Sequence, residues 1–213
     1  MQITPPNKSE LALLEPFTGL PLEKIHVPSV QSDFVTATEE ILAAGIVGFD
    51  TESKPTFKVG DVSTGPHLVQ FSLPDKAYLF RLHHAEGDPF LIELLQSANL
   101  IKAGFGLKSD GKHIFAKLGI RMNGVVDLNR VFSMRGYQKE MGVRNAVGLV
   151  FKQRFVKSRK VTTSNWAQAQ LTPQQMLYAA NDAYAALKVL EALNISREDL
   201  SSVVMQSQPI LQD

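Results

Sequence analysis

Cysteine is absent from this chain of 213 residues, which excludes disulfide bonds and thiolate metal sites and, with them, zinc-finger folds. The sequence also lacks any apolar run that approaches the length of a transmembrane helix. Its amino terminus, MQITPPNKSE, does not have the basic and then apolar pattern of a signal peptide. Together these absences predict a soluble cytoplasmic protein that has no contact with a membrane.

A strong net charge is missing as well, because 22 Lys and Arg against 21 Asp and Glu give a formal charge of +1. The charges are nevertheless unevenly distributed. The segment 152–160 has no acidic residue and contains Lys152, Arg154, Lys157, Arg159 and Lys160. Phosphate groups attract such side chains, and Arg159 and Lys160 are our best candidates for nucleic-acid contact. A solvated loop is the alternative for any single one of these lysines. Three more lysines flank an aspartate at position 110, namely Lys102, Lys108 and Lys112.

Acidic residues that could bind metal occur in three separate places, and the first holds Asp50 and Glu52 in the stretch GIVGFDTES. The apolar run 46–49 is typical of a buried strand, and it follows a helical segment that Ser32 opens and Gly45 closes. Side chains alternate along a strand, so Asp50 and Glu52 point to the same side. Carboxylates this close repel each other unless a cation lies between them, and Mg²⁺ or Mn²⁺ would suit. For an isolated Asp-x-Glu, a solvated loop would be the simpler interpretation.

The second place is Asp110 in KAGFGLKSDGKH, and the third is Tyr178 with Asp182 in YAAND. Thr172-Pro173-Gln174-Gln175 predicts a helix start near 173, with a threonine N-cap, proline at the first position and a capping box. Tyr178 and Asp182 stand four residues apart and therefore lie one turn apart on this helix. The predicted buried stripe of the helix is a different set: Met176, Ala180, Ala183, Leu187 and Leu190.

In this order and context, Asp50-Thr51-Glu52, the stretch 104–110 and Tyr178-x-x-x-Asp182 resemble the three motifs of the DEDD 3'-5' exonucleases. The tyrosine is similar to that of the DEDDy subgroup, which includes ribonuclease D and the Werner syndrome exonuclease domain. The other subgroup has a histidine five positions before the last aspartate, where this chain has Leu177. The flanking stretches 67–71 and 164–166 also look like their counterparts, so the resemblance spans residues 25–195.

The resemblance implies a ribonuclease H-like fold and hydrolysis of phosphodiester bonds from the 3' end of DNA or RNA, with release of nucleoside 5'-monophosphates. It also implies two divalent metal ions, Mg²⁺ or Mn²⁺. Carried over to this chain, Asp50 would bridge both ions, Glu52 and Asp182 would hold the first, and Asp110 would support the second. Tyr178 would orient the attacking water, since a phenol with a pKa near 10 stays protonated at neutral pH.

The hydrophobic periodicity predicts an α/β fold with a mixed central sheet of about five strands and helices on both faces. Strands are expected at 46–51, 67–73, 77–81, 100–103 and 124–127, with 67–73 and 77–81 joined as an antiparallel hairpin. Helices are expected near 33–44, 89–97, 108–117, 142–151 and 173–193. We expect a single domain over 25–195, with residues 1–24 and 200–213 as poorly ordered or peripheral tails.

Four further residues lie near the motifs. Thr51, through its backbone, and Phe105, beside the second motif, are candidates for contact with the terminal nucleotide. His113 follows Asp110 by three residues and could hydrogen-bond near the site, although a direct role is not expected. Trp166 could stack on a base, but we expect it to pack in the core.

Two other functions remain open at this stage. A catalytically silent nucleic-acid-binding module of the same fold predicts at least one missing carboxylate, and none is missing. A hydrolase of small nucleotide phosphodiesters predicts a closed pocket, and the basic segment argues against it. The sequence separates neither DNA from RNA nor single strands from duplexes, and it identifies no protein partner.

Overall fold

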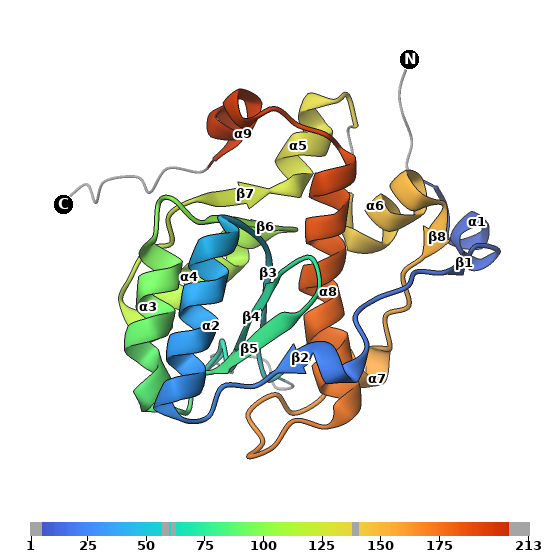
Figure 1. Ribbon diagram of the computed structural model, residues 1–213. Helices are drawn as coiled ribbons and strands as arrows, with labels where there is room; N and C mark the ends of the chain where they lie inside the picture. Colours follow the sequence, from blue (N-terminus) through green and yellow to red (C-terminus); the bar gives the residue numbers. More distant parts are fainter. Residues whose placement is uncertain (1–5, 57–59, 61–62, 138–140, 205–213) are drawn as a thin grey trace.

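The computed structural model of the protein describes residues 6–56, 60, 63–137 and 141–204. Its centre is a six-stranded mixed sheet with the order β2-β5-β4-β3-β6-β7 (Figure 1). The strands are β2 (Ile25–His26), β3 (Ile46–Glu52), β4 (Leu68–Ser72), β5 (Ala77–Arg81), β6 (Ile101–Gly104) and β7 (Val125–Asp127). The predicted mixed sheet is thus confirmed, with the two-residue β2 added at one edge.

The pairing pattern explains why the sheet is mixed. Strand β3 is antiparallel to β4 and parallel to β6, and β4 and β5 form the predicted antiparallel hairpin. The turn of this hairpin is closed by a hydrogen bond from the Leu73 amide to the Lys76 carbonyl, 2.8 Å long. Strands β6 and β7 are parallel, as expected for strands that are separated by a helix.

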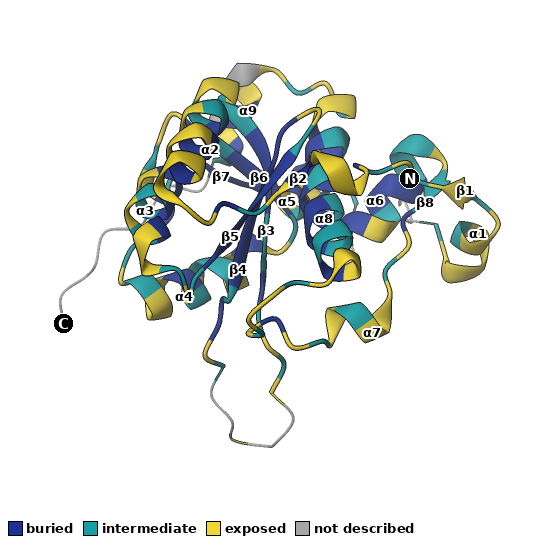
Figure 2. Cartoon of the chain, turned by 60° about the horizontal axis from the view of Figure 1, so that its bottom comes forward, coloured by how far each residue is buried: buried dark blue, intermediate teal, exposed yellow. Residues whose placement is uncertain are grey.

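Helices cover both faces of the sheet (Figure 1). On one face, α2 (Gln31–Ala44), α3 (Asp88–Gln96) and α4 (Leu107–Leu118) bury Phe34, Leu94 and Ile114 against β3 and β4. On the other face, α8 packs along the sheet beside α6. The bounds of these two helices are Pro173–Ala192 and Gly142–Phe151. Figure 2 shows the buried sheet between the two helical layers.

The ends of two helices test the sequence-based capping signals. Helix α8 begins as predicted, since Thr172 accepts a hydrogen bond from the Gln175 amide and the Gln175 side chain accepts one from the Thr172 amide. Helix α2 was expected to open at Ser32, and this was wrong, because its N-cap is Val30. The carboxylate of Asp33 accepts the Val30 amide at 3.3 Å, so the helix is capped from within and needs no serine hydroxyl. Gly45 ends this helix in the left-handed region at φ +69°, as expected.

Gly48 allows an unusually close approach between β3 and α8. A β-carbon at this position would lie 1.9 Å from the carbonyl oxygen of Ala183, so only glycine fits there. Asp182 directly precedes Ala183 on α8, and Asp50 lies two residues after Gly48 on β3. Because Gly48 has no side chain, β3 and α8, which carry the first and the last acidic motif, can come into direct contact.

Several short elements were not expected from the sequence. Strands β1 (Glu15–Pro16) and β8 (Gln153–Arg154) form a separate parallel pair. The remaining helical segments are α1 (Lys8–Ala12), η1 (Leu22–Lys24), η2 (Ala85–Gly87), α5 (Leu128–Met134), α7 (Arg159–Thr162) and α9 (Arg197–Val203).

The two predicted tails are only partly described. In the amino-terminal one, Leu20 is buried, and its amide donates to the side-chain oxygen of Asn181 on α8 at 2.6 Å. In the carboxy-terminal one, Leu200 and Val203 of α9 are buried. Residues 1–5 and 205–213 of these tails lie outside the described residues. Within the described residues, no helix combines the length and the apolar character that are needed to cross a membrane.

Candidate active site

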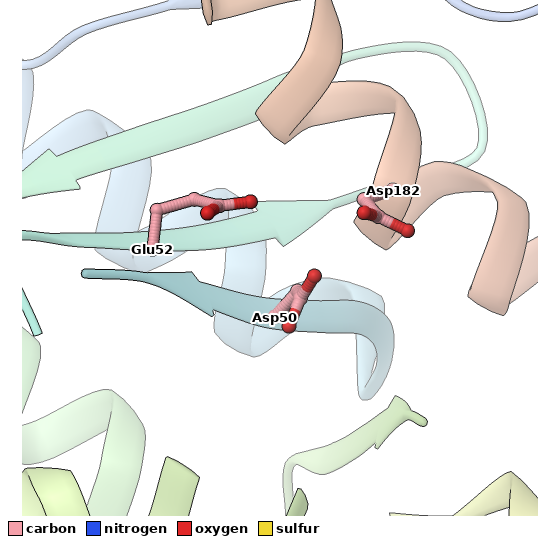
Figure 3. Close-up of side chains that lie close together, drawn as sticks. All are labelled: Asp50, Glu52 and Asp182. Atoms are coloured by element: carbon pink, nitrogen blue, oxygen red, sulfur yellow. The ribbon is translucent and has the colours of Figure 1, made fainter. Parts of the chain in front are cut away.

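Three of the predicted carboxylates converge where the end of β3 meets α8. Along β3, Val47 and Phe49 face the core beneath α2, α3 and α4, so Asp50 and Glu52 project from the opposite face toward α8. Asp182 of α8 projects to meet them, and Figure 3 shows the three side chains gathered around one point. One carboxylate oxygen of each lies within 4.8 Å of the others.

Burial and mutual repulsion make this arrangement costly for ionised carboxylates. Burial raises the pKa of Asp50 well above its usual value, and the negative charges of Asp182, Asp110 and Glu52 raise it further. Burial, with the charge of Asp182, raises the pKa of Glu52 to about 8. Burial also raises the pKa of Asp182. The protein therefore holds together several negative charges that its own interior disfavours, which favours binding of a cation.

Asp110, in the first turn of α4, lies outside this group of three but close enough for its charge to act on Asp50 and Glu52. The hydroxyl of Thr51 donates a hydrogen bond to its carboxylate, so the residue between Asp50 and Glu52 fixes the position of Asp110. Burial raises the pKa of Asp110, although this hydrogen bond acts in the opposite direction. Because Thr51 follows Asp50 along the strand, its side chain points to the α4 side while Asp50 points to α8.

Tyr178 lies beside Asp182 on α8, one turn earlier. Its hydroxyl accepts a hydrogen bond of 3.0 Å from the hydroxyl of Thr162. Burial, together with the charge of Asp182, raises the pKa of Tyr178 to about 12, so the phenol remains protonated at neutral pH. Trp166 packs against Tyr178 with a centroid separation of 6.0 Å and is itself buried, which confirms the expected core position of Trp166.

Lys157 is a residue of this site that the sequence did not single out from its basic segment. Its ammonium group lies 2.5 Å from a carboxylate oxygen of Asp182 and 5.6 Å from the centre of the Tyr178 ring. Burial alone would lower the pKa of Lys157, but the negative charges of Asp182 and Asp50 outweigh burial, and the pKa is raised. The sequence did contain an indication that Lys157 points inward. Phe155 is apolar and lies two residues earlier, and side chains two residues apart in an extended segment point to the same side.

The other residues that the sequence suggested near the site differ in their exposure and in their neighbours. Arg159 and Lys160 are exposed on α7, which packs against α8. Phe105 lies half-buried in the turn between β6 and α4, with its ring stacked on Phe132 at 6.5 Å. His113 is close enough to Asp110 for its charge to lower the pKa of that carboxyl.

Lys102, which flanks Asp110 in the sequence, does not lie at the surface where it could meet a phosphate. Its side chain is fully buried, and its ammonium group donates to the carbonyl oxygens of Leu94, Ser97 and Leu100 at 2.9–3.0 Å. Lysine at this position in β6 therefore ties α3 and the following loop to the sheet. The sequence could not show this, because a lysine in a strand looks the same whether it ends in solvent or on buried carbonyls.

The donors at this site fit a hard divalent cation. Asp50, Glu52 and Asp182 offer only carboxylate oxygens, and such oxygens are the ligands that Mg²⁺ and Mn²⁺ prefer. Their raised pKa values indicate that a positive charge at this point would stabilise all of the ionised groups at once.

Comparison with known proteins agrees with this geometry. The family model for 3'-5' exonucleases matches residues 25–196. A 3'-5' exonuclease of Arabidopsis thaliana is 28% identical over 150 residues, which cover 69% of this chain and 52% of that protein. The bifunctional 3'-5' exonuclease/ATP-dependent helicase WRN of Mus musculus is 30% identical over 150 residues, which cover 70% of this chain and 11% of that protein. The chain thus spans about half the length of the first relative and about a tenth of the second.

Solved structures show the same fold at lower identity. The EXO domain of Aedes aegypti Nibbler superposes with a TM-score of 0.73 at 20% identity and covers 86% of this chain and 97% of that domain. The ribonuclease D of Trypanosoma brucei in complex with RNA U12 gives a TM-score of 0.72 at 18% identity and covers 92% of this chain and 68% of that one. With the match of the family model to most of its length, the chain belongs to the 3'-5' exonuclease family.

Proposed function

We propose that this chain removes nucleotides one at a time from the 3' end of a DNA or RNA strand and releases nucleoside 5'-monophosphates with the aid of two divalent ions, Mg²⁺ or Mn²⁺. The observation that carries the proposal is the convergence of Asp50, Glu52 and Asp182 within 4.8 Å of one another. Asp110 lies close enough for its charge to raise the pKa of Asp50. A catalytically silent module would not need to retain so unfavourable a group of buried acids.

Each carboxylate has a defined part in this proposal. Asp50, Glu52 and Asp182 would hold one ion, and Asp50 with Asp110 would hold the other. When bound, the ions supply activation of the attacking water and stabilisation of the leaving 3' oxygen. Thr51 keeps Asp110 in place, and Gly48 keeps Asp182 opposite Asp50. The side chains are therefore preorganised by the sheet and by α8.

Tyr178 would position the attacking water and would not act as its base. The phenol accepts a hydrogen bond from Thr162 and lies beside the charge of Asp182, and with a pKa of about 12 it keeps its proton. A protonated phenol can donate or accept a hydrogen bond but cannot remove a proton from water at neutral pH. Its contribution is orientation.

A polymeric nucleic acid is the substrate class that we favour. Arg159 and Lys160 are exposed on α7, next to the helix that carries Tyr178 and Asp182, and can bind phosphates upstream of the 3' end. Phe105 and the backbone of Thr51 are candidates for contact with the terminal nucleotide. The ribonuclease D neighbour was solved with RNA, and the mouse relative is named as an exonuclease joined to a helicase, so both RNA and DNA are to be tested.

Digestion of a 5'-labelled oligonucleotide tests the proposal directly. With Mg²⁺ or Mn²⁺ we expect a ladder of steadily shorter products and release of nucleoside 5'-monophosphates, and EDTA should abolish both. Asp182→Asn should remove nearly all activity, because it replaces an anionic ligand by a neutral one of the same shape. Cleavage of a circular single strand, or undiminished activity in EDTA, would refute the proposal.

Tyr178→Phe separates positioning from metal binding. We expect the catalytic rate to fall roughly ten- to a hundredfold, since one hydrogen bond in the transition state is worth about 1–3 kcal/mol. Affinity for Mn²⁺ should stay nearly unchanged in a calorimetric titration. Tyr184→Phe, on the same helix but outside the acidic cluster, is the matched control and should keep the wild-type rate. If Tyr178→Phe weakened Mn²⁺ binding as strongly as Asp182→Asn does, the tyrosine would belong to the metal ligands.

The raised pKa values predict how stability depends on pH. The usual pKa of Glu52 is 4.5 and its pKa in the folded protein is about 8, so between these values the folded state binds more protons than the unfolded state. The free energy of unfolding in EDTA should therefore fall with rising pH, by about 2–4 kcal/mol between roughly pH 5 and pH 8. Urea unfolding measures this fall. The free energy of unfolding should depend less on pH in the Glu52→Gln variant, and also in the wild-type protein at saturating Mn²⁺. A wild-type curve that stays flat in EDTA would contradict the assigned pKa shifts.

A further inference from the structure

The acidic cluster already contains a cation that belongs to the protein itself. The ammonium group of Lys157 makes an ion pair of 2.5 Å with Asp182, one of the three carboxylates that could share a metal ion. Its charge also lowers the pKa of Asp50 and of Glu52. Lys157 thus acts on all three carboxylates in the same direction as a bound divalent ion would.

The backbone that carries Lys157 is held in place. Just before it, β8 pairs with β1 and Phe155 is buried. The guanidinium group of Arg144 donates to the carbonyl oxygen of Lys157 at 3.3 Å, and Ser158 forms the N-cap residue of α7 directly afterwards. Only the long side chain is therefore free to change position, and it is 29% exposed.

Electrostatics makes Lys157 and a divalent ion rivals. A carboxylate oxygen that has an ammonium nitrogen 2.5 Å away has no room for a metal ion on the same side. An ammonium group is also repelled by an adjacent divalent cation, and this repulsion is strong where water is largely excluded. Asp182 is only 5% exposed, so screening by solvent is weak at this oxygen.

We propose that Lys157 is a built-in counter-cation that competes with the divalent metal for Asp182 and has to leave this carboxylate before the metal can bind it. The proposal rests on the proposed function only in taking the acidic cluster as the metal centre. It gives Lys157 two successive partners. Paired with Asp182, the ammonium group offsets the repulsion among the buried acids. Once displaced, it stays beside the centre on its own backbone, where a substrate phosphate can become its new partner.

A consequence of this competition is that metal and substrate assist each other. A phosphate that accepts the displaced ammonium group favours the metal-bound arrangement, and bound metal frees the ammonium group for the phosphate. Lys157 would then weaken the binding of metal alone and strengthen its binding when a strand occupies the site. Loading of the centre would be tied to the presence of substrate.

Calorimetric titration of metal-stripped protein with Mn²⁺ alone tests the competition. Lys157→Met keeps the length of the side chain and removes its charge, and it should tighten Mn²⁺ binding on the order of tenfold. Lys157→Arg keeps the charge and should bind close to the wild-type level. Lys152→Met makes the same charge change at an exposed position five residues earlier and should leave the affinity unchanged. Unaltered or weaker Mn²⁺ binding by Lys157→Met would overturn the proposal.

Labelling of the wild-type protein gives a second test that needs no variant to fold. A mild amine-acetylating reagent, read out by mass spectrometry, should modify Lys157 faster when Mn²⁺ is present, because the ammonium group has left its buried partner. Lys152 serves as the internal reference and should not change. Equal labelling of Lys157 with and without Mn²⁺ would contradict displacement.

Both tests use metal without nucleic acid, so they are independent of the proposed nuclease activity. A protein that behaves as expected here but leaves labelled oligonucleotides intact would overturn the proposed function alone. An active exonuclease in which Lys157→Met binds Mn²⁺ no more tightly would overturn the counter-cation alone.

Discussion

The close contact between β3 and α8 is the constraint on which the site depends. At Gly48 the two elements approach until the backbone of Ala183 occupies the space of a side chain. Alternation along β3 then places Asp50 and Glu52 on the side that faces α8, while helical geometry presents Asp182 from the other direction. A bulkier residue at position 48 would push the helix away and pull the acidic motifs apart. The geometry of the cluster is thus fixed by packing and not by any attraction among the acids.

The acids themselves oppose the arrangement. Burial raises the pKa values of Asp50, Glu52, Asp110 and Asp182, and the charges of neighbouring acids raise those of Asp50 and Glu52 further. The free energy that holds the acids together therefore comes from the hydrophobic layers on both faces of the sheet. Thr51 reduces the cost by a hydrogen bond to Asp110. Lys157 reduces it further by a direct ion pair. The buried acids lower the stability of the folded protein, and in return they form a centre that attracts cations. Groups with strongly shifted pKa values often cluster in this way at functional sites.

The sequence predicted those features that follow from short-range patterns. The apolar run before Asp50, the capping box at Thr172 and the spacing of Tyr178 and Asp182 each specify a local structure, and each is confirmed. Ser32 misled us because the internal carboxylate of Asp33 caps α2 instead, a choice that local patterning does not decide. Lys102 and Lys157 could not be told apart by charge. One ends on buried carbonyls and the other on Asp182, and this difference arises only from tertiary packing.

Diffraction from crystals soaked in Mn²⁺, with data collected for anomalous scattering, tests the central claim most directly, namely that these carboxylates form a two-ion centre. The account predicts two anomalous peaks. One should be coordinated by Asp50, Glu52 and Asp182, and the other should lie next to Asp50 with Asp110 as its direct or water-mediated partner. The absence of any peak among these four side chains at saturating Mn²⁺, or a single ion held by other residues, would contradict it.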